Sequence, residues 1–487
     1  MKNKKKFILL LLSIFITTFN LLTVGNPLGI IISIPQYIYV LYLIITKQYS
    51  KATLWHMIFI ALSISAVMAQ GMSEGGNGLP TMYNYATLKL IGPISISYVI
   101  TIILFLLLIK HPKINTSRLL QQLTTTILYL AVSGNIIGIL GLCFSTGYFI
   151  SEYIKLNVYI LMCYMTLSVL LKTLDYKQQK KYYFSGIQIL CGASIGCFTA
   201  YLMGVRTTYS VLTIPMLTDI LYFGPILILL LFFESSNKVL IGLSLFMYLF
   251  LVSMSMSGKT VFFLCIAFIY ILYVINFNET YKQNHYRNIT TLRIASWILL
   301  GIIGISIPYI LLDTNSLAGY KILAAMSIFN GDISDVSNSP ATRIGEFMNF
   351  VYNNREDIFH LLFGMGYGGY FTDELKLFEG LDLSGGWSEE IIRTGRFPSA
   401  HDTFSEVPLI NGVVGLFLIL YIGIKIAKHM KSNSFCYAAI PWLIFTFYFT
   451  PSLALTAIFF LAGGLYRKHD SLIKINQKPT NLNNIKS

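Results

Sequence analysis

The chain has 487 residues, of which 55% are hydrophobic and only 11% are charged. A soluble globular protein carries about 25% charged residues, so this composition excludes an ordinary soluble enzyme and indicates a polytopic membrane protein. The net charge of +14 does not by itself indicate nucleic acid, because Lys and Arg in a membrane chain mark the loops that face the cytoplasm. The six cysteines form no C-x-x-C pair, so we expect neither a disulfide framework nor a metal site.

Apolar runs long enough for membrane spans recur along the chain. A helix needs about 20 apolar residues to cross a bilayer. Fourteen candidate runs fit, at 7–24, 27–46, 54–70, 87–109, 123–142, 156–174, 184–203, 214–233, 239–256, 261–276, 294–312, 406–427, 435–450 and 452–466. The last two are short and separated only by Pro451, so they are also a candidate re-entrant pair and the total is 12–14. The first run follows a Lys cluster but has no small-x-small cleavage site, which favours a retained helix.

Basic residues alternate between the two sides of the predicted bundle. With the N-terminus inside, the inner segments hold 25 Lys and Arg and four acids, and the outer segments hold 10 Lys and Arg and 16 acids. This is the asymmetry that the positive-inside rule expects. We therefore place both termini in the cytoplasm.

The spans divide the chain into four parts. Residues 1–312 form an N-terminal bundle of about 11 helices, 313–405 a large extracytoplasmic loop, 406–466 the C-terminal spans, and 467–487 a polar tail that we expect to be disordered. Loops as long as 313–405 usually carry function.

The large loop contains a predicted helix. Ser339 and Pro340 are typical of a helix start. Four apolar residues then recur on one helical face, which suits a helix on the surface of the membrane or bundle. They are Ile344, Phe347, Met348 and Val351.

Two glycine motifs resemble phosphate-binding loops but lack the required context. Residues 257–260 (SGKT) match the end of a P-loop, yet the earlier glycine of that pattern is replaced by Ser253. Residues 364–369 (GMGYGG) contain G-x-G-x-x-G without a preceding strand. We interpret 364–369 as a tight bend that lets the loop re-enter the membrane surface.

Cations on the outer side oppose the general charge trend and are candidate ligand contacts. Each one alone is more simply an interfacial anchor or a partner of an outer acid. Together they suit a lipid-linked pyrophosphate, which needs positive charge near the headgroup plane. They are Lys89, Lys155, Arg206, Lys259, Lys321, Arg343, Arg355, Lys376, Arg393 and Arg396.

Asp219 is the one acid that we place inside a predicted span. An ionisable group at the centre of a spanning helix costs at least about 2.5 kcal/mol, so such a group is a functional candidate. Because Asp219 lies near the outer end of its run, an ion pair with Arg206 or Lys259 is an equal alternative.

The stretch 399–416 (SAHDTFSEVPLINGVVGL) carries the sharpest chemical signal. His401 stands directly before a span, and an imidazole can take a proton from a sugar hydroxyl near neutral pH. Gly412 and Gly415 would let neighbouring helices approach closely.

These motifs resemble the superfamily of O-antigen ligases and Wzy-type O-antigen polymerases. In that family a His precedes G-x-x-G on the helix after the large periplasmic loop. The segments 339–343 (SPATR) and 362–368 (LFGMGYG) are similar to its Ser-x-x-x-Arg helix and its FGxGxG turn, and 257–259 (SGK) resembles its S-R pair with Lys in place of Arg. The likeness covers roughly residues 255–425.

The resemblance implies an all-helical bundle of glycosyltransferase type C character in the bacterial inner membrane. It implies a polymerase that moves a growing glycan from undecaprenyl pyrophosphate onto the next lipid-linked repeat unit, without a metal or other cofactor. The partners would be the lipid-linked oligosaccharide, membrane lipid and a candidate chain-length regulator, with no nucleic acid. His401 would be the base or positioner, Arg206, Lys259 and Arg343 would hold the pyrophosphate, and Arg393 or Arg396 would assist. Asp219 and Asp402 would support the site.

Two alternatives remain at this stage. An O-antigen ligase would use the same chemistry to move finished polymer onto a lipid A core sugar, and the number of predicted spans favours the polymerase. A flippase or secondary transporter for lipid-linked sugar would predict two similar halves with broken helices and ionisable groups at the midplane. The sequence shows neither.

Overall fold

A computed structural model of the chain describes most of its length. The described residues are 2–64, 82–91, 94–114, 117–145, 147–209, 212–233, 237–255, 338–379, 383, 387–400, 403–429, 435 and 451–466. Within them the fold is mostly helical, with three short antiparallel hairpins. The helices are α1 (Lys2–Leu22), η1 (Pro27–Gly29), α2 (Ile30–Ile45), α3 (Tyr49–Ala61), α4 (Ile96–Leu108), α5 (Arg118–Phe144), α6 (Ile150–Thr173), α7 (Tyr176–Leu202), η3 (Asp219–Phe223), α8 (Pro225–Phe233), α9 (Lys238–Ser255), α14 (Asn338–Asn353), α15 (Ile358–Phe363), α16 (Glu389–Thr394), α17 (Thr403–His429) and α19 (Pro451–Gly464).

Six helical stretches of the described residues are long and apolar enough to cross a membrane, so the chain is a helical membrane protein. They are Lys5–Leu22, Pro27–Ile45, Arg118–Phe144, Ile150–Thr173, Tyr176–Leu202 and Thr403–Ile426. Three shorter apolar helices, Ile96–Leu108, Lys238–Met254 and Ser452–Gly464, also fall on predicted spans. The predicted spans 261–276, 294–312 and 435–450 and the tail 467–487 lie outside the described residues, Phe435 excepted.

The predicted span 214–233 is wrong as a single helix. Strand β4 (Leu212–Pro215) pairs with β3 (Arg206–Tyr209), η3 follows, and only then does the short helix α8 begin at Pro225. Proline lacks the N–H that a helix interior needs, so Pro215 and Pro225 divide this apolar run. The predicted span 87–109 is also shorter than expected, because strands β1 (Lys89–Ile91) and β2 (Ile94–Ser95) precede α4.

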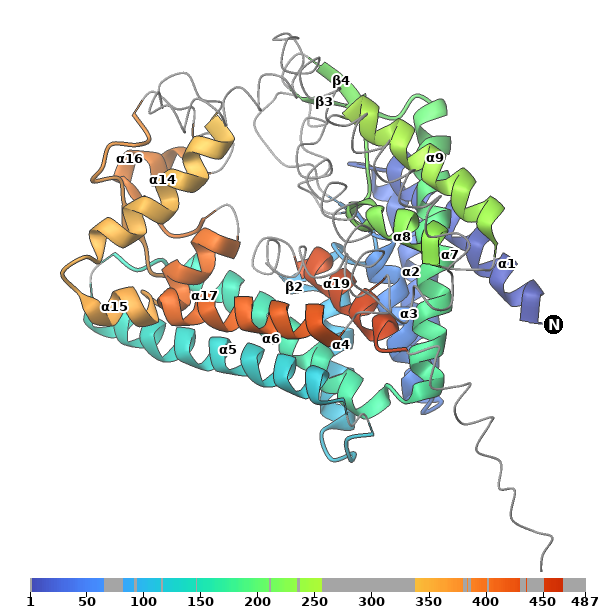
Figure 1. Cartoon of the computed structure of the whole chain (residues 1–487), viewed down its shortest axis with the longest axis horizontal. Helices are drawn as coiled ribbons and strands as arrows, with labels where there is room; N and C mark the ends of the chain where they lie inside the picture. Colours follow the sequence, from blue (N-terminus) through green and yellow to red (C-terminus); the bar gives the residue numbers. More distant parts are fainter. Residues whose placement is uncertain are drawn as a thin grey trace, which may run out of the picture.

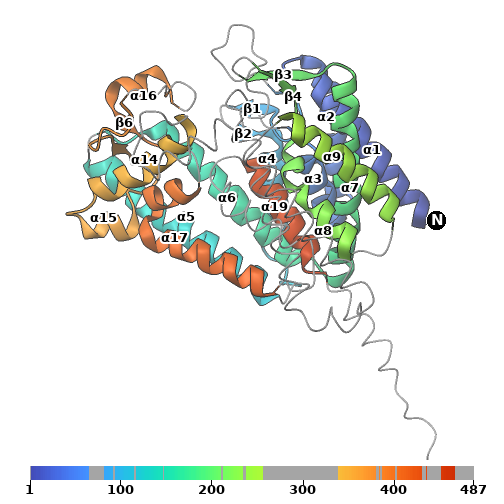
Figure 2. The same cartoon turned by 45° about the horizontal axis from the view of Figure 1, so that its top comes forward.

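The described helices form two groups that meet along α6 (Figures 1 and 2). In the first, the α7 group, α1, α9 and α19 pack on α7, α3 contacts α7 and α19, and α2 and α8 lie against α3 and α9. In the second, the α17 group, α5 lies between α6 and α17, and α14 and α15 pack against α17. Helix α6 bridges the groups through its contacts with α3, α4 and α19.

The glycine-rich segment 364–369 hydrogen-bonds to α17 and packs against the backbone of α5. Helix α17 is broken at Gly412 (φ 66°, ψ −171°), and the break removes helical partners from nearby carbonyls. Amides of the turn replace them, since Met365 N–H donates to Leu409 O (2.7 Å) and Gly366 N–H to Ile410 O (3.0 Å). Gly366 (φ 75°) touches the backbone of α5, where a Cβ would come within 2.2 Å of an amide nitrogen. The prediction of a tight bend is therefore confirmed.

Candidate functional site

Helix α14 exposes three of the four residues of its predicted apolar face and buries two polar side chains, while Val351 is half-buried against the aromatic cluster that contains Phe350. Ile344, Phe347 and Met348 are 42%, 38% and 47% exposed, whereas Glu346 and Asn349 on the other face are at most 1% exposed. Exposed apolar side chains opposite buried polar ones suit a helix whose apolar side contacts lipid and whose polar side contacts the protein interior. The predicted helix and its surface position are thus borne out, and its buried polar face is the first sign of a site.

The start of α17 supplies the second part of the site. Thr403, Ser405 and Glu406 are all buried there, and the Ser405 hydroxyl donates to the Arg343 carbonyl of α14 (3.2 Å). Glu406 is 2% exposed, and its Oε2 accepts a hydrogen bond from the Ala400 N–H. Its Oε1 is buried without a hydrogen-bond partner among the described residues. A buried carboxylate with one oxygen unsatisfied is costly, which marks it as a candidate functional group.

Helix α6 brings further charge to the same place. Glu152 and Lys155 form an ion pair in its first turns (Nζ–Oε2, 3.1 Å). Both lie close enough to Glu406 to act on it electrostatically, as does Glu346. Residues of three helices therefore form one polar cluster, which is buried at Glu346 and Glu406 and partly exposed at Lys155. We call it the polar junction, and its members are Glu152, Lys155, Thr342, Arg343, Glu346, Thr403, Ser405 and Glu406.

An aromatic cluster supports the polar junction from the loop side. Phe371 and Phe397 stack face to face (5.4 Å between ring centroids) across the hairpin of β5 (Phe371–Thr372) and β6 (Arg396–Phe397). Trp387 packs on Phe397 (4.7 Å) and donates from Nε1 to the Ser399 carbonyl (3.0 Å). Ser399 and Ala400 are thus held by Trp387 and Glu406, directly before the predicted base.

Of the predicted site residues, three lie in the α17 group. Arg343 is half-buried in the polar junction, and Arg393 and Arg396 are exposed on α16 and β6. Arg393 and Arg396 are connected to α14 through the β5–β6 pair, because α14 contacts β5 and β5 pairs with β6. The Arg396 guanidinium lies over the Tyr370 ring (5.2 Å). His401, Asp402 and Lys259 lie outside the described residues, although both neighbours of the His401–Asp402 pair are described.

Arg206 is placed apart from this site. Its Nη1 donates to the carbonyls of Tyr201 and Val205 at the end of α7, and its guanidinium stacks on the Tyr201 ring (3.4 Å). In both views the β3–β4 hairpin lies over the α7 group, away from α14 and α16 (Figures 1 and 2). Arg206 therefore caps α7, in line with the simpler interpretation of an outer cation.

Asp219 does not lie in a spanning helix of the described residues, so the prediction of one continuous span that contains it is wrong. It begins η3, is 1% exposed, and accepts a hydrogen bond from the Ser452 hydroxyl (2.8 Å) at the start of α19. A carboxylate is favourable near a helix N-terminus, because the unpaired amides there carry partial positive charge. Asp219 thus joins η3 to α19 within the α7 group.

The sequence analysis missed Glu406, Glu346 and Glu152. Glu406 was counted with the outer acids, but α17 begins at Thr403, so this carboxyl lies on a spanning helix. An acid at the start of an apolar run was the signal that could have identified it. Glu346 lies on the polar face of an amphipathic helix, which a sequence alone would assign to water.

No group of three His, Cys, Asp or Glu side chains in the described part of the chain is arranged to hold a metal ion. The polar junction offers the half-buried Arg343, the ion-paired Lys155 and the buried carboxyl groups of Glu346 and Glu406.

Comparisons with known proteins return no relative. No protein-family model matches the chain, and neither the curated proteins nor the solved structures contain a significant match.

Proposed function

We propose that the chain is a membrane glycosyltransferase that polymerises a glycan carried on undecaprenyl pyrophosphate, at the outer face of a bacterial inner membrane. The observation that carries the proposal is the polar junction. It combines Arg343, from the helix that resembles the family's Ser-x-x-x-Arg element, with the start of the helix that follows His401. The exposed apolar face of α14 would lie in the membrane surface, where a lipid-linked substrate is delivered.

The proposed reaction is an in-line displacement at an anomeric carbon. His401 takes the proton from the acceptor hydroxyl of the incoming repeat unit, and the resulting oxygen nucleophile attacks the first sugar of the growing chain. The bond between that sugar and the pyrophosphate breaks, and its electron pair leaves with the lipid pyrophosphate. Arg343 stabilises this charge, since a guanidinium pairs with phosphate oxygens in bidentate geometry.

The remaining predicted cations have different places in the proposal. Arg393 and Arg396, exposed on α16 and β6, would guide the anionic substrate toward Arg343. Arg206 is left out, because its guanidinium is already engaged at the end of α7. The role of Lys259 remains a prediction from the family resemblance.

The proposal is tested in a strain that lacks the chain, complemented with variants. Wild type should restore a ladder of glycan lengths, whereas His401→Ala and Arg343→Ala should give only a single repeat on the acceptor lipid. Arg355→Gln is the matched control. This exposed arginine follows α14, lies over the Tyr352 ring (3.8 Å) and should leave the ladder unchanged.

Equal membrane abundance of the variants must be verified. A normal ladder with His401→Ala would overturn the proposed base. Accumulation of long lipid-linked polymer in the deletion strain would instead identify a ligase, because polymerisation would then be intact.

A further inference from the structure

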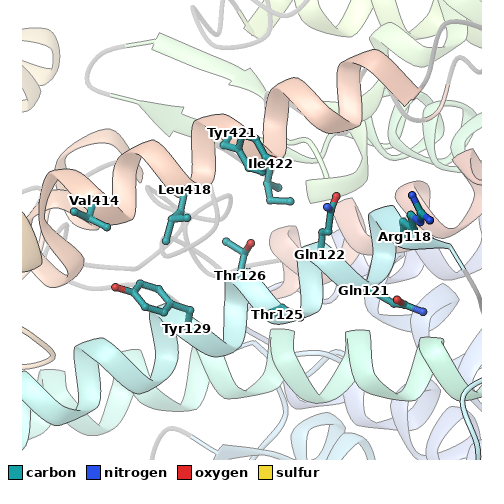
Figure 3. A pocket seen from close by; sticks show the side chains of 10 residues that line it. All are labelled: Arg118, Gln121, Gln122, Thr125, Thr126, Tyr129, Val414, Leu418, Tyr421 and Ile422. Atoms are coloured by element: carbon teal, nitrogen blue, oxygen red, sulfur yellow. The ribbon is translucent and has the colours of Figure 1, made fainter.

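Helices α5 and α17 run antiparallel, are joined at one end and separate toward the other. At the joined end the Asn411 Nδ2 donates to the Leu130 carbonyl and to the Ser133 hydroxyl (2.9 Å each). Gly415 leaves room for the Asn411 side chain, since a Cβ there would lie 2.4 Å from the Asn411 Cβ. Beyond this point a groove of about 640 Å³ opens between the two helices (Figure 3).

The two walls of the groove differ in chemistry. The wall on α5 is polar and the wall on α17 is mostly apolar, as Figure 3 shows. The polar wall consists of Arg118, Gln121, Gln122, Thr125, Thr126 and Tyr129, and the other of Val414, Leu418, Tyr421 and Ile422. Both helices are long and apolar enough to span a membrane. Polar side chains on a spanning helix normally face protein or a cavity, so this polar wall needs an amphiphilic occupant.

The charge at the open end selects an anion. Arg118 stands at this end (Figure 3) and makes no ion pair with any residue that the structure describes. Lys425, which does not line the groove, lies over the ring of the groove residue Tyr421 (5.2 Å) and adds a second cation on α17. Neither helix can neutralise these cations locally, because the sequence contains no Asp or Glu in 75–151 or in 407–469.

We propose that this groove binds an anionic phospholipid taken from the leaflet at the Arg118 end. Arg118 would pair with the phosphate, Gln121 and Gln122 would bond the headgroup and glycerol oxygens, and an acyl chain would lie along Leu418 and Ile422. A phospholipid is the amphiphile that a bilayer supplies, and an anionic headgroup supplies the negative charge that is missing from this end of both helices. The site is separate from the polar junction and does not depend on the proposed reaction.

The test is a thermal-unfolding measurement on the purified chain in neutral detergent, with phosphatidylglycerol or phosphatidylcholine added at equal mole fractions. A ligand that binds only the folded state raises the unfolding temperature, and a tighter ligand raises it further at the same concentration. We expect phosphatidylglycerol to raise that temperature well above the value with phosphatidylcholine. Arg118→Gln should lose most of the difference. Lys110→Gln, which removes an exposed cation that does not line the groove, should keep it.

A second variant separates the groove from its charge. Leu418→Trp would fill the groove from its apolar wall while Arg118 stays in place. This variant should also lose the rise in unfolding temperature with phosphatidylglycerol. If the tryptophan variant does not fold, Arg118→Gln alone decides. An equal lipid effect in Arg118→Gln and wild type would overturn the proposal.

Two further outcomes would also contradict it. Inorganic phosphate that reproduces the full shift would mean an anion site without a lipid. A wild-type dimer that becomes monomeric in Arg118→Gln or Leu418→Trp would mean that a second copy of the chain covers the groove.

Discussion

Gly412 occupies a backbone conformation that an L-amino acid rarely adopts, at a point where another segment touches the backbone. Its φ of 66° and ψ of −171° lie in a region used almost only by glycine, and a side chain there costs about 1–3 kcal/mol. A Cβ would also come within 2.2 Å of the backbone carbon and oxygen of Leu362. Backbone atoms cannot move aside cheaply, so overpacking adds about 1–3 kcal/mol. We expect Gly412→Ala to lower the free energy of unfolding by about 2–6 kcal/mol in total.

Two other glycines separate these contributions. Gly395 has a φ of 64°, and a Cβ added there would meet nothing within 4 Å, so Gly395→Ala should show backbone strain alone, about 1–2 kcal/mol. Gly242 lies in α9 without positive φ and with the same open space, so Gly242→Ala should be neutral or stabilising by up to about 1 kcal/mol. We therefore expect Gly242→Ala to be at least as stable as wild type, Gly395→Ala to be less stable than wild type, and Gly412→Ala to be the least stable.

The assay heats each detergent-solubilised variant and follows the fraction that still elutes as a monodisperse species. Equal expression and equal detergent are required for the comparison. A Gly412→Ala variant as stable as Gly242→Ala would refute the packing of 364–369 and α15 against the break in α17.

Variants at three further positions test other contacts. Glu406→Ala should reduce polymer yield about 2- to 10-fold, because the hydrogen bond that Glu406 accepts from the Ala400 N–H is lost and contributes about 0.5–1.5 kcal/mol. Glu406→Gln keeps an acceptor oxygen and should stay near wild type, so equal losses in the two variants would contradict a positioning role. Tyr148→Phe removes the hydrogen bond to the Met365 carbonyl (2.9 Å) and should lower the free energy of unfolding by about 1 kcal/mol at neutral pH. Burial raises the pKa of Tyr148 from 10.0 to about 12. As the pH rises between these values, the unfolded wild type loses its Tyr148 proton first, so the stability difference between wild type and Tyr148→Phe should disappear. A stability difference that stays constant over this pH range would refute the burial of the hydroxyl. Arg206→Ala should lower the unfolding temperature, because it loses the Tyr201 stack, yet leave activity per folded molecule unchanged; lost activity at full stability would return Arg206 to the substrate site.

The helical spans were predictable because their signal is local. A continuous apolar run must hydrogen-bond its backbone internally within a bilayer, so composition alone indicated helices such as α1, α5 and α7. The run 214–233 failed for the opposite reason. Its hydropathy is that of a span, but Pro215 and Pro225 interrupt it and divide it into a strand, a 3₁₀ turn and a short helix. Proline position carried more information there than average hydropathy.

The site was only partly predictable, because its members are joined by packing across long sequence separations. The sequence indicated Arg343 and the start of α17 as separate motifs, and the structure brings them together through the Ser405 hydroxyl. Glu152 and Glu346 had no motif to identify them, since the burial of Glu346 depends on α14 packing against α17 and Glu152 comes near Glu406 only in the folded bundle. Arg206 shows the converse case. A cation on the predicted outer side satisfied the pattern of a ligand contact while serving as a helix cap.

The most direct test of the central claim uses the purified chain in proteoliposomes with a single lipid-pyrophosphate-linked repeat unit and no ion gradient. The account predicts that wild type lengthens the glycan and releases free lipid pyrophosphate in step with each added unit. His401→Ala and Arg343→Ala should abolish both products, while Arg355→Gln should preserve them. Movement of unextended substrate across the bilayer without lengthening would contradict the account and identify a transporter.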